Sequence, residues 1–266
     1  MRVDFLLPLT LFSIIAASLL VYRRVERKMR SILEDRKLKA HEAILMVASI
    51  GVFVTLVALM PSHLIQTLFL FAYFYMLLIF SYIILGRWLL AVFPPIIFIA
   101  AYLSTIFLTP ENSLAAFISM NLFAAFFAIM VIAYMNSLFS WRITLIFAAF
   151  LTAIDFIQVF WTGHMVEAAY KMEALRLPVT ISSHLARLGL GDVFLSGLLS
   201  TQTAAKYGLK TGLITAAAIS ISLLIFEVLV LNSLIEYSVF PATIIVLLGW
   251  LLGVGPQVLK ERISGE

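Results

Sequence analysis

Long continuous runs of apolar residues make up most of this chain, and short polar segments separate them. Each run has about 20 residues, the length at which an α-helix crosses a bilayer core of about 30 Å. The runs do not alternate in polarity, so the pattern favours helices over the strands of a membrane barrel. The sequence predicts nine membrane-spanning helices, at approximately 5–21, 43–60, 64–85, 88–108, 114–139, 143–160, 190–206, 212–235 and 240–259.

Composition agrees with this pattern. Of the 266 residues, 63% are apolar and 12% are charged, whereas soluble proteins carry roughly 25% charged residues. We therefore expect an all-α, multi-pass membrane protein. Most connections are short, so residues 1–266 should form a single transmembrane domain, with the first five helices in 1–140 and the last four in 141–266. The first apolar run lacks a small-residue cleavage site and is expected to be a retained helix.

The seventh predicted helix is the least apolar. Its hydroxyl and amide side chains make it unsuited to lipid contact, so it should be buried among the other helices. These side chains are Ser196, Ser200, Thr201, Gln202 and Thr203.

The distribution of Lys and Arg predicts the orientation of the helices. The connections that follow the odd-numbered helices hold 14 of the 18 basic residues, and the opposite side holds the other 4. Because basic connections stay in the cytoplasm, the N-terminus and the 161–187 connection are expected outside the cell and the C-terminus inside.

Three acids lie within the predicted helices: Asp155, Asp192 and Glu227. No Lys, Arg or His lies in a helix interior, so no obvious ion-pair partner is available. A carboxyl group in hydrocarbon is costly, which makes each of them a functional-site hypothesis. Glu227 has two interpretations: a protonated group bonded to Asn232 or to another helix, or a proton route or substrate contact.

Asp155 and Asp192 should lie close together. Asp155 is about five residues before the end of the sixth helix and Asp192 about three residues into the seventh, so both are several Å below the same face. Helices adjacent in sequence are usually neighbours in space. Two carboxyl groups at close range share one proton, which supplies an acid and a base together. That pairing can activate water and protonate a leaving amine, as in aspartic proteolysis.

Two glycines precede the second aspartate. Gly189 and Gly191 leave the backbone exposed and allow another main chain to approach. Their alternative role is close packing of helices through small residues. The Gly-x-Gly-Asp pattern is weak alone, but it becomes specific at the start of a polar helix that follows a helix with an isolated aspartate.

In this arrangement the chain resembles the presenilin and signal peptide peptidase family of intramembrane aspartyl proteases. The resemblance rests on GLGD at 189–192, on Asp155, on the Pro241-Ala242 step that opens the last helix, and on HMVEAAYKMEALRLPVTI; it is specific over about 145–260. It implies a presenilin-like bundle of nine helices in which Asp155 and Asp192 are the catalytic pair. It further implies that a group of six residues contacts substrate: Gly189, Leu190, Gly191, Pro241, Ala242 and Thr243.

The chain departs from the family pattern at two positions. Ile154 stands where the family usually has Tyr, and Thr243 stands where it has Leu. Neither change removes a catalytic group, but both bear on substrate preference. Thr243 also fits a simpler role, because Thr often serves the ends of helices.

The resemblance implies hydrolysis of peptide bonds within transmembrane helices or signal peptides, with membrane lipid as the surroundings and no nucleic acid, metal or cofactor. The chain has no cysteine and no HExxH motif, which excludes thiol chemistry and argues against a zinc protease. A proton-coupled transporter or channel that uses the three acids as a relay is the alternative. The segment RLPVTISSHLARLGL before Asp192 is interpreted either as a strand that pairs with an extended substrate or as a disordered loop.

Overall fold

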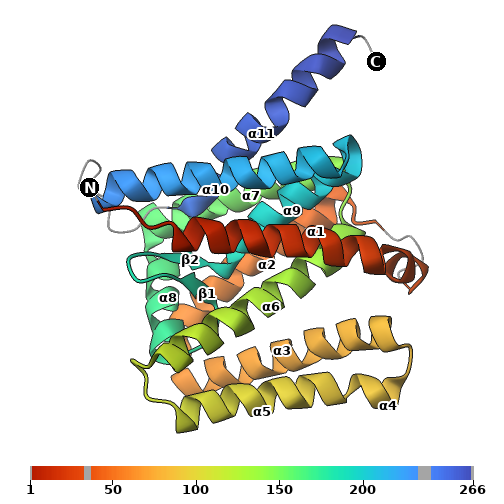
Figure 1. Cartoon of the computed structure of the whole chain (residues 1–266). Helices are drawn as coiled ribbons and strands as arrows, with labels where there is room; N and C mark the ends of the chain where they lie inside the picture. Colours follow the sequence, from red (N-terminus) through yellow and green to blue (C-terminus); the bar gives the residue numbers. More distant parts are fainter. Residues whose placement is uncertain (1, 33–36, 233–240, 265–266) are drawn as a thin grey trace.

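The computed structural model describes residues 2–32, 37–232 and 241–264. The described residues form helices with one π-helical turn, η1, and two short strands (Figure 1). In chain order they are α1 (Leu6–Ile32), α2 (Ala40–Leu59), α3 (Ser62–Leu85), α4 (Trp88–Ala91), α5 (Phe93–Leu108), α6 (Leu114–Leu138), α7 (Trp141–Ile157), η1 (Gln158–Thr162), α8 (His164–Ala174), β1 (Thr180–Ser182), β2 (Arg187–Gly189), α9 (Leu190–Tyr207), α10 (Leu209–Leu231) and α11 (Ala242–Ser264).

Within the described ranges, eight helical segments are long and apolar enough to cross a membrane. The protein is therefore an all-α, multi-pass membrane protein in its main architecture. The seventh predicted helix exists as α9, but its polar side chains keep it outside this set of eight. The count of nine spanning helices thus rests on how α9 is interpreted.

α9 lies inside the bundle, as its polarity predicts. It contacts α1, α6, α7, α10 and α11, and its residues from Leu195 to Thr203 are all buried. The Gln202 amide donates to Oδ1 of Asn136 on α6 at 2.7 Å, and Trp250 of α11 donates its ring N–H to the Thr203 hydroxyl at 3.1 Å. Polar side chains therefore join α9 to its neighbours where lipid could not satisfy them.

Several boundaries differ from those expected. α1 continues beyond 21 to Ile32, because the Arg, Lys and Glu residues of the basic segment are good helix formers. The fourth predicted helix is divided into α4 and α5 around Pro94 and Pro95, which occupy the first turn of α5. Proline lacks the N–H that a continuous helix would need at that point.

The 161–187 connection is folded, and the segment RLPVTISSHLARLGL contains a hairpin, so the alternative of a disordered loop for that segment is wrong. It contains α8 and an antiparallel hairpin in which Ile181 faces Leu188. The Leu190 N–H donates to the Val179 carbonyl at 2.9 Å, so the strand ladder runs directly into the first turn of α9. The hairpin is thereby fixed to the helix that carries Asp192.

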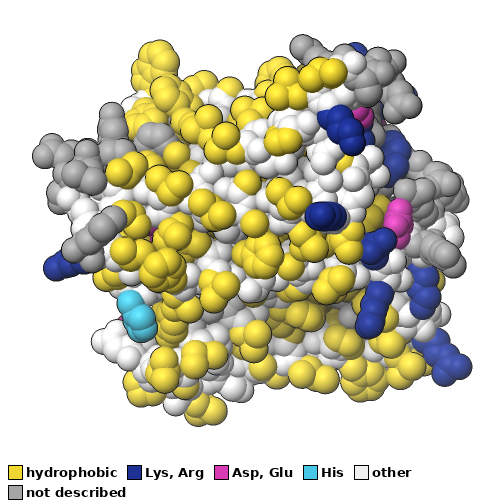
Figure 2. All heavy atoms as spheres, turned by 45° about the horizontal axis from the view of Figure 1, so that its top comes forward, with side chains coloured by type: hydrophobic (Ala, Val, Ile, Leu, Met, Phe, Trp, Pro, Cys, Tyr) yellow, Lys and Arg dark blue, Asp and Glu magenta, His cyan; other side chains and the backbone are white. Residues whose placement is uncertain are grey.

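Basic side chains gather at one end of the molecule (Figure 2). Three contacts show that the predicted connections meet there. Lys28 binds the Ile84 carbonyl at the end of α3, Lys37 binds the Ser137 carbonyl at the end of α6, and Lys206 of α9 pairs with Glu261 of α11. The opposite end carries α8 and the hairpin, with Asn232 bonded to the backbone of Arg2.

Candidate active site

The structure brings Asp155 and Asp192 into one small cavity. Both line a space of about 70 Å³, together with Thr243 and Gly191, and the two carboxyl groups interact electrostatically. A water molecule needs about 10–15 Å³ of such space, so the cavity has room for a few waters. The juxtaposition predicted from helix depth is thus present.

Asp155 lies in the last turn of α7 and is 5% exposed. The Thr243 hydroxyl donates a hydrogen bond to its Oδ2 atom at 2.7 Å. Thr243 is the second residue of α11 and not its N-cap. A helix-capping role therefore does not explain its hydrogen bond to Asp155. This partner of Asp155 could not be found from sequence spacing, because 88 positions separate the two residues.

Close packing against α2 fixes the end of α7. The Gln158 amide, in the π-helical turn η1, donates to the Gly51 carbonyl at 2.8 Å. A Cβ atom at Gly51 would lie 3.1 Å from Cγ2 of Ile154, so a larger residue there would press on the turn that carries Asp155. Ile154 also lines the dyad cavity.

Asp192 lies in the first turn of α9, where the positive end of the helix dipole stabilises an acidic side chain. A Cβ atom at Gly189 would lie 3.4 Å from Oδ2 of Asp192, so the carboxyl group rests against the extended backbone of that glycine. Apart from its chain neighbours and the backbone of its own helix, no atom of the described residues lies within 4 Å of a Cβ built on Gly191, which faces open space. Gly189 therefore supports the carboxyl group and Gly191 leaves the cavity open.

The other predicted site residues lie in four different surroundings. Pro241 is buried immediately before α11, Ala242 lines a second and larger cavity, and Thr243 lines the dyad cavity. Leu190 packs against the hydrophobic core. It therefore supports α9 and does not line the dyad cavity.

One interpretation of the sequence had Glu227 bonded to Asn232, but the structure shows no such bond. The Asn232 side chain binds the N–H and carbonyl of Arg2 and the Val228 carbonyl. Both Glu227 carboxyl oxygens are buried, and no described group forms a hydrogen bond with them. Other polar side chains do find partners: Asn121 of α6 binds the backbone of Ser182 in β1, and Gln202 of α9 binds Asn136 of α6.

The arrangement offers two carboxyl groups, one hydroxyl donor and space for water inside a membrane bundle. Comparison of the chain with protein-family models and with curated proteins finds no match.

Proposed function

We propose that the protein is an intramembrane aspartyl protease that hydrolyses peptide bonds of transmembrane helices or signal peptides. The observation that carries the proposal is the shared cavity of Asp155 and Asp192, in which the Thr243 hydroxyl is bonded to one carboxyl group. The resemblance to presenilin and signal peptide peptidase supports the same activity and a nine-helix bundle, in which α9 is the additional helix.

In the proposed reaction the dyad holds one proton. The hydroxyl of Thr243 stabilises an ionised Asp155, and Asp192 carries the proton. Asp155 removes a proton from water as the water oxygen attacks the scissile carbonyl carbon, and Asp192 gives its proton to the carbonyl oxygen. In the second step the C–N bond breaks, the amide nitrogen takes a proton from Asp155, and one hydroxyl of the diol returns its proton to Asp192. The products are a carboxylic acid and an amine.

Substrate has to be extended at the scissile bond, because a helix keeps its amides in internal hydrogen bonds. The hairpin offers a template. In its register Ile181 and Leu188 form the hydrogen-bonded pair, so the backbone groups of Arg187 and Gly189 point away from β1. The equivalent outward groups of Ser182 on β1 are already bound by Asn121. We therefore place an extended substrate beside β2, by strand addition.

The decisive test is a cleavage assay. The purified protein, reconstituted in liposomes, is mixed with a fluorescent transmembrane reporter, and products are identified by mass spectrometry. We expect peptide hydrolysis by the native chain and none by Asp192→Ala. Proton flux without cleavage would favour the transporter alternative and overturn the proposal.

The proposed orientation places the hairpin outside the cell. Ser183 is buried and bonded to Asp4, so it is a poor labelling position, whereas Leu185 is 48% exposed. In intact cells a cysteine at Leu185 should react with an impermeant maleimide, and one at exposed Ser31 should not. Because the chain has no native cysteine, each signal comes from one position. The reverse labelling pattern would mean that the protein has the opposite orientation in the membrane.

A further inference from the structure

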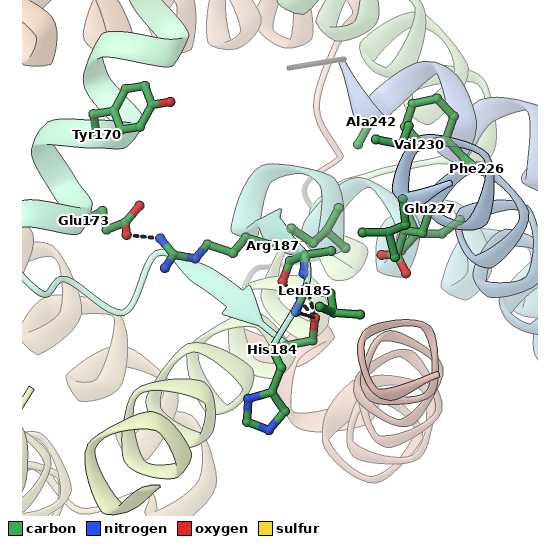
Figure 3. Close-up of a pocket in the computed structure, with 14 residues that line it drawn as sticks. Tyr170, Glu173, His184, Leu185, Arg187, Phe226, Glu227, Val230 and Ala242 are labelled. Carbon is green, nitrogen blue, oxygen red and sulfur yellow. Dashed lines mark hydrogen bonds and ion pairs between the residues drawn. The ribbon is translucent and has the colours of Figure 1, made fainter. Parts of the chain in front are cut away.

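A second cavity, of about 600 Å³, lies between the hairpin and the end of α10 (Figure 3). Its described lining includes Arg187 and Leu188 of β2, Glu227 of α10, and Ala242. Ala242 is followed by Thr243, which is bonded to Asp155. A group in this cavity would therefore lie next to the dyad and beside the free edge of β2.

Glu227 is the acid that the cavity leaves without a partner. It is 6% exposed, and neither of its carboxyl oxygens has a hydrogen-bond partner among the described groups. Figure 3 shows its carboxyl group directed from α10 toward the hairpin near Leu185. Burial without hydrogen bonds is unfavourable for a carboxyl group, so the side chain is poised for a donor that enters the cavity.

The charged side chains near Glu227 already have ion-pair or hydrogen-bond partners. Glu173 of α8 forms an ion pair with Arg187, and Asp4, which interacts electrostatically with Glu227, accepts hydrogen bonds from the Ser183 hydroxyl and the Leu6 N–H. The His184 ring is stacked on Phe117 of α6, and Figure 3 shows it directed away from Glu227. The cavity thus keeps an acidic character around Glu227.

The wall around Glu227 is apolar. Leu223, Phe226 and Val230 of α10 line the cavity beside it. An apolar wall that ends in a carboxyl group suits a side chain with a long aliphatic stem and a cationic head, since the stem packs on the wall and the head meets the carboxylate. Lys and Arg have that construction.

We propose that this cavity is a substrate subsite for a Lys or Arg side chain, and that Glu227 binds its cationic head. The proposal rests on the proposed proteolytic function. It predicts that preferred substrates carry a basic residue within a few positions of the scissile bond, on the side of that bond nearer the hairpin.

Cross-linking tests the contact without any variant. A transmembrane peptide of Leu and Ala with uncharged Asn and Gln flanks carries a single Lys, which is moved through successive positions, and norleucine replaces it in the control peptide. With a hydrophobic carbodiimide, the Lys amine should form an amide with Glu227 at one or two positions, identified by mass spectrometry. Cross-links confined to exposed acids such as Glu111 and Glu167 would overturn the proposal.

Selectivity tests the consequence. The ratio of kcat/KM for the Lys peptide to that for the norleucine peptide should be about 10 to 100 in the native protein, the range expected for a hydrogen bond between charged groups. It should fall toward 1 in Glu227→Gln and keep its native value in Glu167→Gln, whose carboxyl group is on α8 outside the cavity lining. A native ratio near 1 at every position, or a ratio that survives Glu227→Gln, would overturn the proposal.

Failure of the subsite and failure of the protease are distinguishable. If the norleucine peptide is cleaved and Asp192→Asn abolishes that cleavage, the protease stands, and the ratio alone decides the subsite. If neither peptide is cleaved, cross-linking to Glu227 still decides whether the cavity binds a cation. If Glu227→Gln does not fold, the cross-linking result on the native chain decides.

Discussion

The two acidic cavities of this protein differ in how their carboxyl groups are satisfied. In the dyad cavity, of about 70 Å³, Asp155 accepts a hydrogen bond from Thr243, and Asp192 rests against Gly189. In the larger cavity, of about 600 Å³, Glu227 has no partner among the described residues. The protein supplies a hydrogen-bond donor to Asp155, whereas the described residues supply none to Glu227.

This difference indicates different uses. A carboxyl group held by a fitted donor beside a space for a few waters, as Asp155 is, is suited to chemistry on water, because its position is fixed before substrate arrives. A carboxyl group that faces a large space without a donor is suited to binding a ligand that supplies one. The consecutive residues Ala242 and Thr243 connect the two, since the first lines the large cavity and the second the small one.

The largest expected effect concerns the dyad. Asp155→Asn, Asp192→Asn and the double variant should each lose cleavage by roughly 10⁴-fold or more, because losses within one catalytic unit do not add. All three should fold, since Asn removes the carboxyl charge and preserves side-chain volume. Cleavage rates and thermal unfolding are measured on the same preparations. Substantial hydrolysis by either single variant would contradict the assignment.

The next effect concerns the donor to Asp155. Thr243→Val keeps the shape of the side chain but removes the hydroxyl, and it should lower kcat by about 10- to 100-fold, the worth of a hydrogen bond to a charged group. Thr243→Ser retains the hydroxyl and should restore most of the activity. KM should change little, because the bond orients a catalytic group and does not hold substrate. A loss that follows only the fraction of folded protein would make Thr243 a structural residue.

Substitution at the preceding residue perturbs both cavities. Ala242→Leu should reduce cleavage and weaken binding of a transition-state-mimicking aspartyl protease inhibitor, because the larger side chain enters the space where extended substrate is expected. Thermal stability should barely change, since Ala242 is only half-buried. Inhibitor titration and melting curves measure the two quantities. Normal inhibitor affinity would place substrate elsewhere.

Single-turnover cleavage should follow a bell-shaped pH profile. The working dyad holds one proton, so gaining a second or losing the first stops catalysis, and each limb should approach tenfold per pH unit. Single-turnover conditions separate the chemical step from product release. A rate that is independent of pH between about 4 and 9 would contradict a shared-proton mechanism.

Much of the fold, and the position of the dyad within it, can be predicted from the sequence. Except at the end of α1, apolar runs place the long helices to within about five residues, and the polar side chains of α9 predict its burial. Both inferences depend on local properties, namely backbone hydrogen bonding and the transfer of side chains from water to lipid. The approach of Asp155 to Asp192 follows from the depth of each acid in adjacent antiparallel helices. These inferences need only residue spacing and the thickness of a bilayer.

Other features depend on packing between distant segments. The Thr243 hydroxyl reaches Asp155 through the packing of α11 on α7, and no spacing rule relates them. Ser183 belongs to a polar connection, yet it is buried against Asp4 near the start of α1. Whether Glu227 has a partner likewise depends on which side chains from α1, α10 and the hairpin meet.

The smallest expected effect concerns the stability cost of Glu227 in the larger cavity. A buried carboxyl group without a hydrogen bond is costly to the folded state, so Glu227→Leu should raise the free energy of unfolding by about 1 kcal/mol. For a chain of this size that corresponds to a rise of roughly 2–4 °C in Tm. Leu fits beside Leu223 and Phe226 on the same wall. Scanning calorimetry in one detergent measures the change, with Glu167→Leu, at an exposed position of α8, as the control. The same substitution should abolish selectivity for the Lys peptide, so that stability rises as specificity is lost. A lower Tm for Glu227→Leu would mean that the carboxyl group is satisfied within the protein, and the contrast between the two cavities would then disappear.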